Sequence, residues 1–541
     1  IDPPFDSKAD YRTKVTLPGV ELEQKPTVIE QFAYSDTWSD GTVSYLAMIT
    51  PRLILMRELL ADTGSIYVHL DWHVGHYVKL VLDEVFGKDS FFNEIIWHYP
   101  DKLQGNINGL PKNHDSIFAY RKSKDAIWNG VKIQLDGARK INRRVWNPTT
   151  KKLDTARDEF GRVIYDSYTE KNADDVWQIA QAEVTKNPNN TGYNTEKPET
   201  LLERVIEASS NAGNLVADFN GGSGTTAAVA EKLGRRWITT DLGKPACMIM
   251  RKRLIDLEAK PFLYQAIGDY QVEAAKATLG RDFRIGDLSQ IVLSLYGALP
   301  LPPDVNPQRN LGHIAGIDLG GRRGSKTLVL ADSPNKLTGT ATLKKAIAQR
   351  DNLLGGWDRV VVLGWNFEPS IGETITALND SRLEVLVIPP DLMDRLKKKG
   401  GLDKLRGQVR FSSLQYLTIH PVVRAAQGDS ETLTVRLKNY VLLSPEAINL
   451  DDDNRTKLQA VANKEPLALI EYWAVDPDYD GKVFRSVWQD YRGNTANDAD
   501  ALRVVTQAVV TVPFKARPRK VAVRVVDVFG FEAEVVSTVE A

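Results

Sequence analysis

A glycine-rich turn between an apolar strand and a helix constrains the fold more than any other feature of this sequence. The predicted strand 214–218 runs into Asn220-Gly221-Gly222-Ser223-Gly224, and a helix is predicted over 225–233. Glycines let the backbone approach a ligand closely, and a helix N-terminus presents unpaired N–H groups. Asp241 closes the next predicted strand, 237–240, where a carboxylate can accept hydrogen bonds from a ribose diol. The pattern predicts a nucleotide-type site in an α/β sheet; the alternative is a purely structural strand–turn–helix corner.

Hydrophobic periodicity upstream of this turn also favours an α/β fold. Apolar spacing predicts helices over 44–61 and 74–86, and strands over 65–71 and 91–99. This alternation is typical of a parallel sheet. From about 101 to 195 the pattern degrades into a polar stretch, and regular order resumes with a helix over 198–209.

The length of 541 residues exceeds what one compact core can organise, so several domains are expected. Four prolines between 297 and 310 indicate a linker. Beyond it, strands are predicted over 359–363 and 383–388, with a helix over 371–378 between them. The predicted domains are listed here in chain order: an α/β domain over 1–296 with an insertion at about 101–195, a linker over 297–310, a small α/β domain over 311–430 and a β-rich domain over 431–541.

Composition excludes several classes of protein. The hydrophobic share of 42% and the charged share of 26% are ordinary for globular domains, and the net charge of −1 says little about partners. The single cysteine, Cys247, excludes a disulfide framework and suits a cytoplasmic location. No apolar run is long enough to span a membrane. We expect no metal site, and interpret the neighbouring His69, His73 and His76 as surface or pocket-rim residues.

The chain opens on Asp2-Pro3-Pro4-Phe5. A carboxylate and a backbone carbonyl fixed by proline can both accept hydrogen bonds from one NH₂ group. Holding both N–H bonds of an aromatic amine frees its delocalised lone pair for attack on an electrophile. The ring of Phe5 can stack on a base that has left a duplex. Taken alone, the tetrapeptide is better explained as a frayed terminus with a chance Pro-Pro.

Together the two motifs resemble the DNA amino-methyltransferases in which the catalytic motif precedes the cofactor motif. The nearest resemblance is to the modification subunits of type III restriction systems and related adenine-specific enzymes. The stretches that carry it, in the order of the family, are Ile1–Phe5, Gly64–His73, Asn93–Trp97, Lys112–Ile117, Gly192–Glu199 with Leu201-Leu202, Asp218–Thr226 and Arg235–Asp241. The resemblance covers about residues 1–260.

The resemblance implies a Rossmann-like S-adenosylmethionine-dependent sheet and a role for each matched residue. Asp2 and the Pro3 carbonyl would hold the target amine, within the catalytic motif that Pro4 and Phe5 complete, and Phe5 would stack on the base. Asp218, Gly222 and Gly224 would contact the methionine end of the cofactor, and Asp241 the ribose. The full set of cofactor-binding residues is Thr195, Lys197, Pro198, Asp218, Asn220, Gly222, Gly224, Thr225 and Asp241. In-line methyl transfer needs positioning more than acid–base power.

The insertion at about 101–195 is interpreted as a target-recognition region, with a solvated loop as the alternative. Its basic side chains can meet phosphates; they are Lys122, Lys124, Arg139, Lys140, Arg143 and Arg144. The expected partners are double-stranded DNA with a flipped base and either a second copy of the chain or a restriction subunit.

Three alternative functions remain. Cytosine amino-methylation uses the same geometry, but a serine in place of Asp2 would favour it, so adenine is preferred. An inactive DNA-binding modification subunit is suggested by Asn220, which stands where the family has an aromatic residue. It is also suggested by the start at Ile1, because the catalytic motif of the family closes a strand preceded by more chain; we expect weak or no activity unless upstream residues or another subunit complete the sheet. A nicotinamide dehydrogenase fits poorly, since Thr225-Thr226-Ala227 stands where its third glycine belongs.

Overall fold

The structure is a computed structural model. It describes residues 1–4, 13–24, 42–100, 109–181, 190–193, 195–265, 285–315, 326–368, 370–389, 392, 396, 405, 409, 411–442, 448, 450–494 and 500–540. The chain divides into two compact units. The N-terminal unit comprises Ile1–Lys8, Ser35–Leu242 and Ala246–Phe262, and the C-terminal unit comprises Ala9–Tyr34, Gly243–Pro245 and Leu263–Ala541.

The first half of the N-terminal unit is a mixed sheet in the order β10-β4-β5-β3. Its elements are α2 (Thr42–Leu59), β3 (Ser65–Leu70), α3 (Gly75–Phe86), η1 (Lys88–Ser90), β4 (Phe91–His98), β5 (His114–Arg121) and β10 (Val176–Gln178). β5 pairs antiparallel with both β3 and β4, so those two strands run parallel to each other, and β10 pairs parallel with β4. The prediction of a parallel sheet is therefore wrong for β5.

The helices of this half cover the sheet with their apolar faces. Val78, Leu82 and Phe86 recur every four residues along α3 and are buried in one core with Leu53 of α2 and Val68 of β3. Four residues per repeat keeps these side chains on one helical face, so the spacing that predicted the helix also explains its packing.

The second half of the N-terminal unit carries the glycine-rich turn. Its elements are α4 (Glu199–Ser209), β11 (Leu215–Asp218), α5 (Thr225–Lys232), β12 (Arg236–Thr239) and α6 (Lys244–Asp256). β11 and β12 pair in parallel, and Ile206, Val229 and Ala230 form the core between α4 and α5. These bounds confirm the predicted strand–turn–helix–strand order to within two residues.

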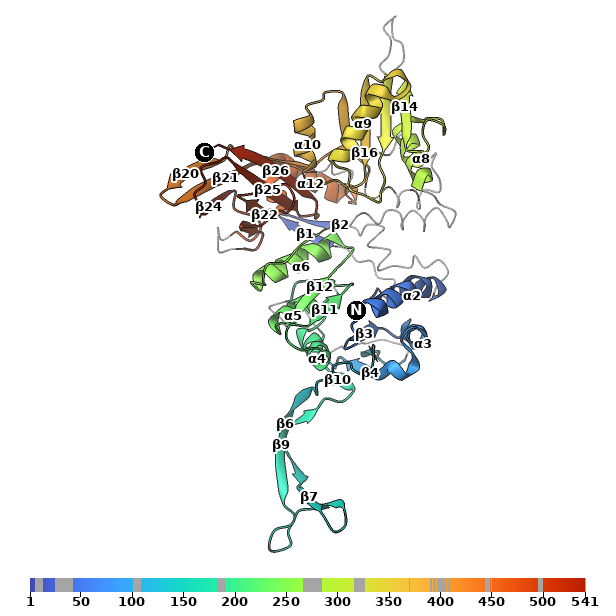
Figure 1. The fold of residues 1–541 in the computed structure, drawn as a ribbon, viewed down its shortest axis with the longest axis vertical. Helices are drawn as coiled ribbons and strands as arrows, with labels where there is room; N and C mark the ends of the chain where they lie inside the picture. The colour runs from blue at the N-terminus through green and yellow to red at the C-terminus, as the bar shows by residue number, and fades with distance from the viewer. Residues whose placement is uncertain are drawn as a thin grey trace, which may run out of the picture. The chain divides into compact units, whose positions relative to one another are not determined.

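A β arm projects from this unit between β5 and β10 (Figure 1). It consists of β6 (Lys132–Asn142) paired antiparallel with β9 (Tyr165–Asn172), and β7 (Arg144–Asn147) paired antiparallel with β8 (Lys152–Thr155). Most of its side chains are exposed, which explains the loss of hydrophobic periodicity in this stretch. The polar insertion is thus limited to the arm, because β5 belongs to the main sheet.

The C-terminal unit begins with an α/β sheet in the order β13-β14-β15-β16-β17-β18. Its elements are α8 (Ile285–Tyr296), β13 (Leu299–Pro300), β14 (Leu311–Ala315), β15 (Lys326–Ala331), α9 (Thr340–Asn352), η2 (Leu353–Gly355), β16 (Arg359–Gly364), α10 (Ile371–Leu378), β17 (Leu383–Val387) and β18 (Ser412–Ser413). Leu288 and Val292 of α8 are buried against Val329 and Val361 of this sheet, and β13 pairs with β14. The structure therefore places α8 and the proline-rich stretch 297–310 inside the α/β domain, where a linker was predicted.

The rest of the C-terminal unit is β-rich. Its elements are β19 (Tyr416–Ile419), β20 (Val423–Gln427), β21 (Ser430–Val441), α12 (Asp452–Lys464), η5 (Pro466–Leu469), β22 (Ile470–Asp476), β23 (Trp488–Tyr491), β24 (Gln507–Pro513), β25 (Arg519–Asp527) and β26 (Glu532–Val539). One sheet has the order β19-β21-β20 with β24 against β21, and the other has the order β23-β22-β25-β26. Both contribute to one core, which confirms a β-rich terminal domain.

An N-terminal hairpin completes that core. β1 (Thr13–Leu17) and β2 (Val20–Gln24) pair antiparallel, and Val15, Leu17 and Leu22 are buried with the side chains of the β-rich domain. Sequence analysis did not predict this long-range packing. Across the described parts of both units, the helices lack the length and apolar character that a membrane crossing requires.

Candidate functional site

Asp2 lies beside β3, at the level of His69. The backbone N–H of His69 donates to the carbonyl of Ile1 at 3.0 Å, and the amino group of Ile1 donates to the carbonyl of Tyr67 at 2.8 Å. Pro3, which follows, is buried. This pairing holds the first residues in a fixed, extended path along the strand.

Two cationic or polar donors hold the carboxylate of Asp2, one at each oxygen. Nδ1 of His69 lies 2.5 Å from Oδ1, and Nζ of Lys197 lies 2.5 Å from Oδ2. Burial alone would raise the pKa of Asp2, but Lys197 and His69 together hold that pKa well below its ordinary value. Asp2 is therefore a carboxylate at neutral pH, able to accept hydrogen bonds but a poor proton acceptor.

His69 is buried, whereas the sequence predicted a surface or pocket-rim residue. Its side chain is 8% exposed, and its Nε2 lies 3.3 Å from Oδ2 of Asp115 on β5. The sequence of β3 does not reveal that His69 is buried. The last three residues of the strand are all buried, so apolar and polar residues do not alternate between its two faces. His73, in contrast, is 41% exposed, as predicted for a surface residue.

The structure describes only part of the remaining catalytic segment. Pro4 is partly exposed, and Phe5 lies outside the described residues. Asn194, in the stretch that leads into the cofactor motif, also lies outside them. Thr195, Lys197 and Pro198 are described, and the ammonium of Lys197 also donates to the carbonyl of Thr195 at 3.1 Å.

Two carboxylates accept hydrogen bonds from the glycine-rich turn and from the start of the helix that follows it. Oδ2 of Asp218 accepts a hydrogen bond from the hydroxyl of Thr226 at 2.6 Å, and its Oδ1 accepts from the N–H of Asn220 at 3.2 Å. Oδ2 of Asp241 accepts from the N–H of Gly222 at 2.9 Å. The structure thus brings the predicted loop and the predicted ribose-binding acid into direct contact.

Two glycines of the turn are required by its geometry. Gly222 has φ +51°, and a Cβ there would stand 3.3 Å from the ring of Tyr193. Gly224 has φ +78°, and a Cβ there would stand 2.5 Å from Cγ of Met250. Side chains at these positions would be strained as well as crowded, so the turn keeps its backbone close to Tyr193.

Arg253 of α6 joins the turn to the segment that carries Lys197. Its Nη1 lies 3.0 Å from Oε1 of Glu196 and donates to the hydroxyl of Thr225 at 3.0 Å, while its Nη2 lies 3.0 Å from Oε1 of Glu199. The side chain is 10% exposed. Sequence reasoning missed Arg253 and assigned no individual role to Tyr193 or Asp115, although these two lie in stretches that carry the resemblance, because their roles depend on partners far away in the chain.

The predicted DNA-contacting residues divide between two places. Arg139 and Lys140 on β6, Arg143, and Arg144 on β7 are exposed on the arm, whereas Lys122 follows β5 and donates to the carbonyl of Arg57 at the end of α2. Arg143 also pairs with Asp166 at 2.6 Å. Lys124 is exposed. Four of the six predicted cationic residues therefore lie on the arm. The ammonium of Lys122 is instead hydrogen-bonded to the last turn of α2.

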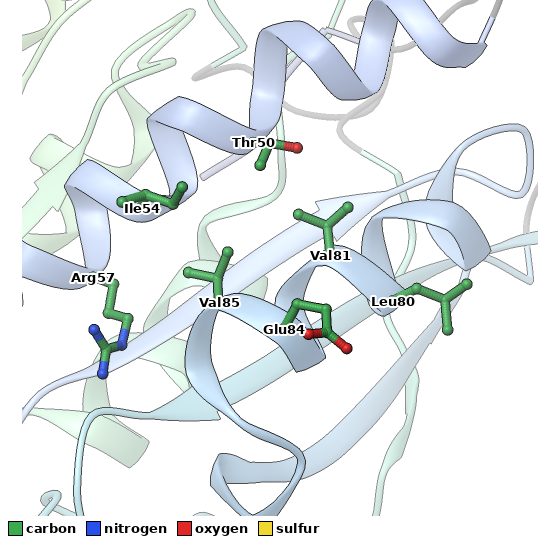
Figure 2. A pocket seen from close by; sticks show the side chains of 7 residues that line it. All are labelled: Thr50, Ile54, Arg57, Leu80, Val81, Glu84 and Val85. Atoms are coloured by element: carbon green, nitrogen blue, oxygen red, sulfur yellow. The ribbon is translucent and has the colours of Figure 1, made fainter.

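A groove lies between α2 and α3, apart from these residues (Figure 2). Thr50, Ile54 and Arg57 line it from α2, and four residues of α3, including Leu80 and Val85, line it from the other side. None of the predicted site residues is among those that line it. Within the described residues, no group of three or more His, Cys, Asp or Glu side chains is arranged to hold a metal ion.

Comparison with known proteins matches the same part of the chain. Residues 1–252 match the family described as DNA methylase. The type II methyltransferase M.EcaI of Enterobacter cloacae is 29% identical over 41% of this chain and 60% of its own length. The Mod subunit of the type III restriction-modification enzyme EcoP15I of Escherichia coli is 26% identical over 26% of this chain and 23% of its own. A crystal structure titled as an M1.HpyAVI–SAM complex is 18% identical, covers 38% of this chain and 82% of its own, and has a TM-score of 0.26.

The family match and the two sequence relatives confirm the resemblance to DNA methyltransferases, including the Mod subunits, over the N-terminal part of the chain. The matched residues contain both the Asp2 segment and the glycine-rich turn. The chain spans between about a quarter and three fifths of the length of the two relatives.

Proposed function

We propose that this chain is a DNA methyltransferase of a restriction-modification system, and that it methylates the exocyclic 6-amino group of adenine. One observation carries the proposal. The carboxylate of Asp2 is fixed at both oxygens, and one of its two partners, Lys197, belongs to the segment that Arg253 fastens to the glycine-rich turn. An amine acceptor and a nucleotide-type turn are therefore built into one polar network.

Asp2 and Pro3 would hold the amine. The two oxygens of a carboxylate offer about four lone-pair directions, so one hydrogen bond to each oxygen leaves room for an N–H of the base. The carbonyl of Pro3 would accept the second N–H. Because the pKa of Asp2 is held low, the carboxylate orients the amine without removing its proton before transfer.

The glycine-rich turn suits S-adenosylmethionine, which supplies an electrophilic methyl group when bound. Asp218 and Asp241 provide carboxylates for an ammonium group and a ribose diol, and Gly222 brings the backbone close to Tyr193. Thr195, Lys197 and Pro198 would line the same pocket, with Asn220, Gly224 and Thr225 in the turn itself. Proximity and orientation are the main contributions required of these residues.

The arm would meet double-stranded DNA. Arg139, Lys140 and Arg144 are exposed there, and phosphate contacts of this kind set register and affinity. A flipped adenine would then reach Asp2, with Phe5 stacking on it. A second copy of the chain or a restriction subunit is the proposed protein partner.

Adenine is proposed over cytosine because the chain has Asp2 where a serine would favour cytosine. The test uses duplex DNA of mixed sequence and S-adenosylmethionine with a deuterated methyl group, followed by digestion and mass spectrometry of the nucleosides. Labelled N6-methyladenine is expected, and its loss is expected in Asp2→Ala. Detection of labelled N4-methylcytosine in place of N6-methyladenine would identify cytosine as the target.

The second candidate, an inactive DNA-binding subunit, rests on Asn220. Calorimetry with S-adenosylmethionine separates the two, since an inactive subunit would bind DNA without binding the cofactor. Single-molecule sequencing of DNA from cells that express the gene would give the modified base and its sequence context.

A further inference from the structure

His69 is enclosed by charged groups from three parts of the chain. Nδ1 faces Asp2 at 2.5 Å and Nε2 faces Asp115 at 3.3 Å, while Lys197 approaches from beyond Asp2. The ring also lies against Trp97 of β4, with centroids 5.6 Å apart. The backbone N–H of His69 is used as well, in its bond to Ile1.

Two carboxylates facing one imidazole favour two protons on the ring. A neutral imidazole donates from only one nitrogen, so it can satisfy only one of the two acids, whereas imidazolium donates to both. Burial lowers the pKa of His69, but Asp2 and then Asp115 raise it, against a lowering by Lys197, and the balance lies above the ordinary value. The geometry and the charges therefore favour the same protonation state.

The other partner of Asp2, Lys197, also donates to the carbonyl of Thr195, but its bond to Asp2 is less directional than that of His69. Lys197 carries a compact charge on a flexible stem, whereas the His69 ring is held in β3 by backbone pairing and by Trp97. Asp115 in turn is hydrogen-bonded by Tyr99. A line of polar groups thus runs from Tyr99 through Asp115 and His69 to the carboxylate.

We propose that His69, as an imidazolium held by Asp115, is a positioning residue that sets the orientation of the Asp2 carboxylate toward the target amine. The proposal rests on the amine-methylating function proposed above. Asp115 acts through His69, which it faces at 3.3 Å. A misplacement of about 1 Å in such a group lowers a rate on the order of a hundredfold.

Three variants of the full chain test this in steady-state methyl transfer, with cofactor affinity measured by calorimetry and folding by thermal unfolding. His69→Leu should lower kcat on the order of tenfold to a hundredfold, because it removes a charge-assisted hydrogen bond. His69→Asn, whose amide can still donate toward Oδ1 of Asp2, should recover part of that loss. KM for S-adenosylmethionine should not change in either variant.

The matched control is His73→Asn. His73 also faces an aspartate, Asp71, at 2.5 Å and lies four residues further along, but it is exposed. Its substitution should leave kcat unchanged. A kcat of His69→Leu equal to that of the unaltered chain would overturn the proposal, and so would an equal loss in His73→Asn.

The third variant, Asp115→Asn, gives a readout that a merely structural role would not move. The unaltered chain should lose kcat as pH rises through the pKa of His69. Because Asp115 raises that pKa, its neutralisation should move the decline to lower pH, and His69→Asn should abolish it. An identical decline in Asp115→Asn and in the unaltered chain would contradict the proposal. This comparison does not depend on whether a variant at His69 folds.

A measurement independent of activity separates this proposal from the proposed function. The chain has seven histidines, so ¹⁵N-histidine labelling gives a short set of ring signals, and His69→Asn assigns the one at issue. An imidazolium signal at pH 7 is expected for His69. A neutral ring at that pH would overturn the positioning role even if the chain methylates DNA. Absence of methyl transfer to any base despite cofactor and DNA binding would instead overturn the proposed function and, with it, this role.

Discussion

The β1–β2 hairpin separates the candidate catalytic segment from α2 in the sequence, yet its apolar face belongs to the core of the β-rich domain. Leu22 is 0% exposed and Leu17 is 1% exposed within that core. Two polar contacts add to the packing: the N–H of Glu23 donates to Oδ1 of Asn454 at 3.3 Å, and Arg492 donates to the carbonyl of Thr16. We therefore predict that a cavity at Leu22 destabilises the C-terminal unit.

Leu22→Ala gives the magnitude. Removal of a fully buried leucine side chain costs about 2–5 kcal/mol, from lost transfer free energy and from the cavity left behind. The upper half of that range is expected only if the core cannot collapse onto the hairpin. Since β1 and β2 form a two-stranded sheet without further strand partners among the described residues, partial collapse is easier, and we expect about 2–3 kcal/mol.

Hydrogen exchange followed by mass spectrometry is the appropriate assay, because it reports opening free energies segment by segment in a chain of two units. Peptides from β22 and β25 should lose protection in Leu22→Ala, while peptides from β3 and β5 should keep theirs. The control is Glu21→Ala on the same strand, whose side chain is 57% exposed in its pair with Lys14. Its effect should stay within about 0.5 kcal/mol.

Unchanged protection of β22 and β25 in Leu22→Ala would refute the reasoning. It would mean that the hairpin rests on a core that is complete without it. Equal losses in Leu22→Ala and Glu21→Ala would also count against it, since the argument depends on burial of the apolar face alone.

Three further predictions concern other parts of the chain. Arg253→Gln should weaken cofactor binding by calorimetry roughly tenfold, because it removes charge-assisted contacts that hold the glycine-rich turn. Burial raises the pKa of Asp527 to about 6, so its protonated form stabilises the fold. That contribution, about 3 kcal/mol, is complete below pH 4 and is lost as pH rises through 6, and denaturant unfolding of Asp527→Asn should lack this dependence. Arg139→Ala and Lys140→Ala should each reduce the salt dependence of DNA binding by about one unit of log–log slope, whereas Arg143→Ala, whose cation is paired with Asp166, should reduce it less.

Local patterns predicted the elements whose packing is itself local. α10 has the predicted bounds, and α3, β11 and α5 agree with their predicted ranges to within one residue. In each, the apolar spacing along a single segment decides which face is buried, so no information from distant parts of the chain is needed.

Elements defined by distant pairing escaped prediction. β5 lies between β3 and β4, with its apolar run of only Ile117–Tyr120 flanked by polar residues, and it pairs antiparallel with the preceding strand β4 and with the more distant β3. The hairpin β1–β2 belongs to a core formed by residues beyond 416. Both cases require knowledge of which strands meet, and hydrophobic periodicity does not carry that knowledge.

The same distinction applies within the candidate site. The motifs predicted which residues would gather, and the structure adds the contacts that hold them. Lys197, predicted to line the cofactor pocket, and His69 both contact Asp2, and Arg253 lies between Glu196 and Thr225. Because Lys197 and Glu196 are adjacent, the 195–199 segment is ion-paired with Asp2 through Lys197 and with Arg253 of α6 through Glu196, and Arg253 also donates to Thr225. A displacement of this short segment would change both contacts together, so the geometry of the amine acceptor and that of the cofactor turn are not independent of each other.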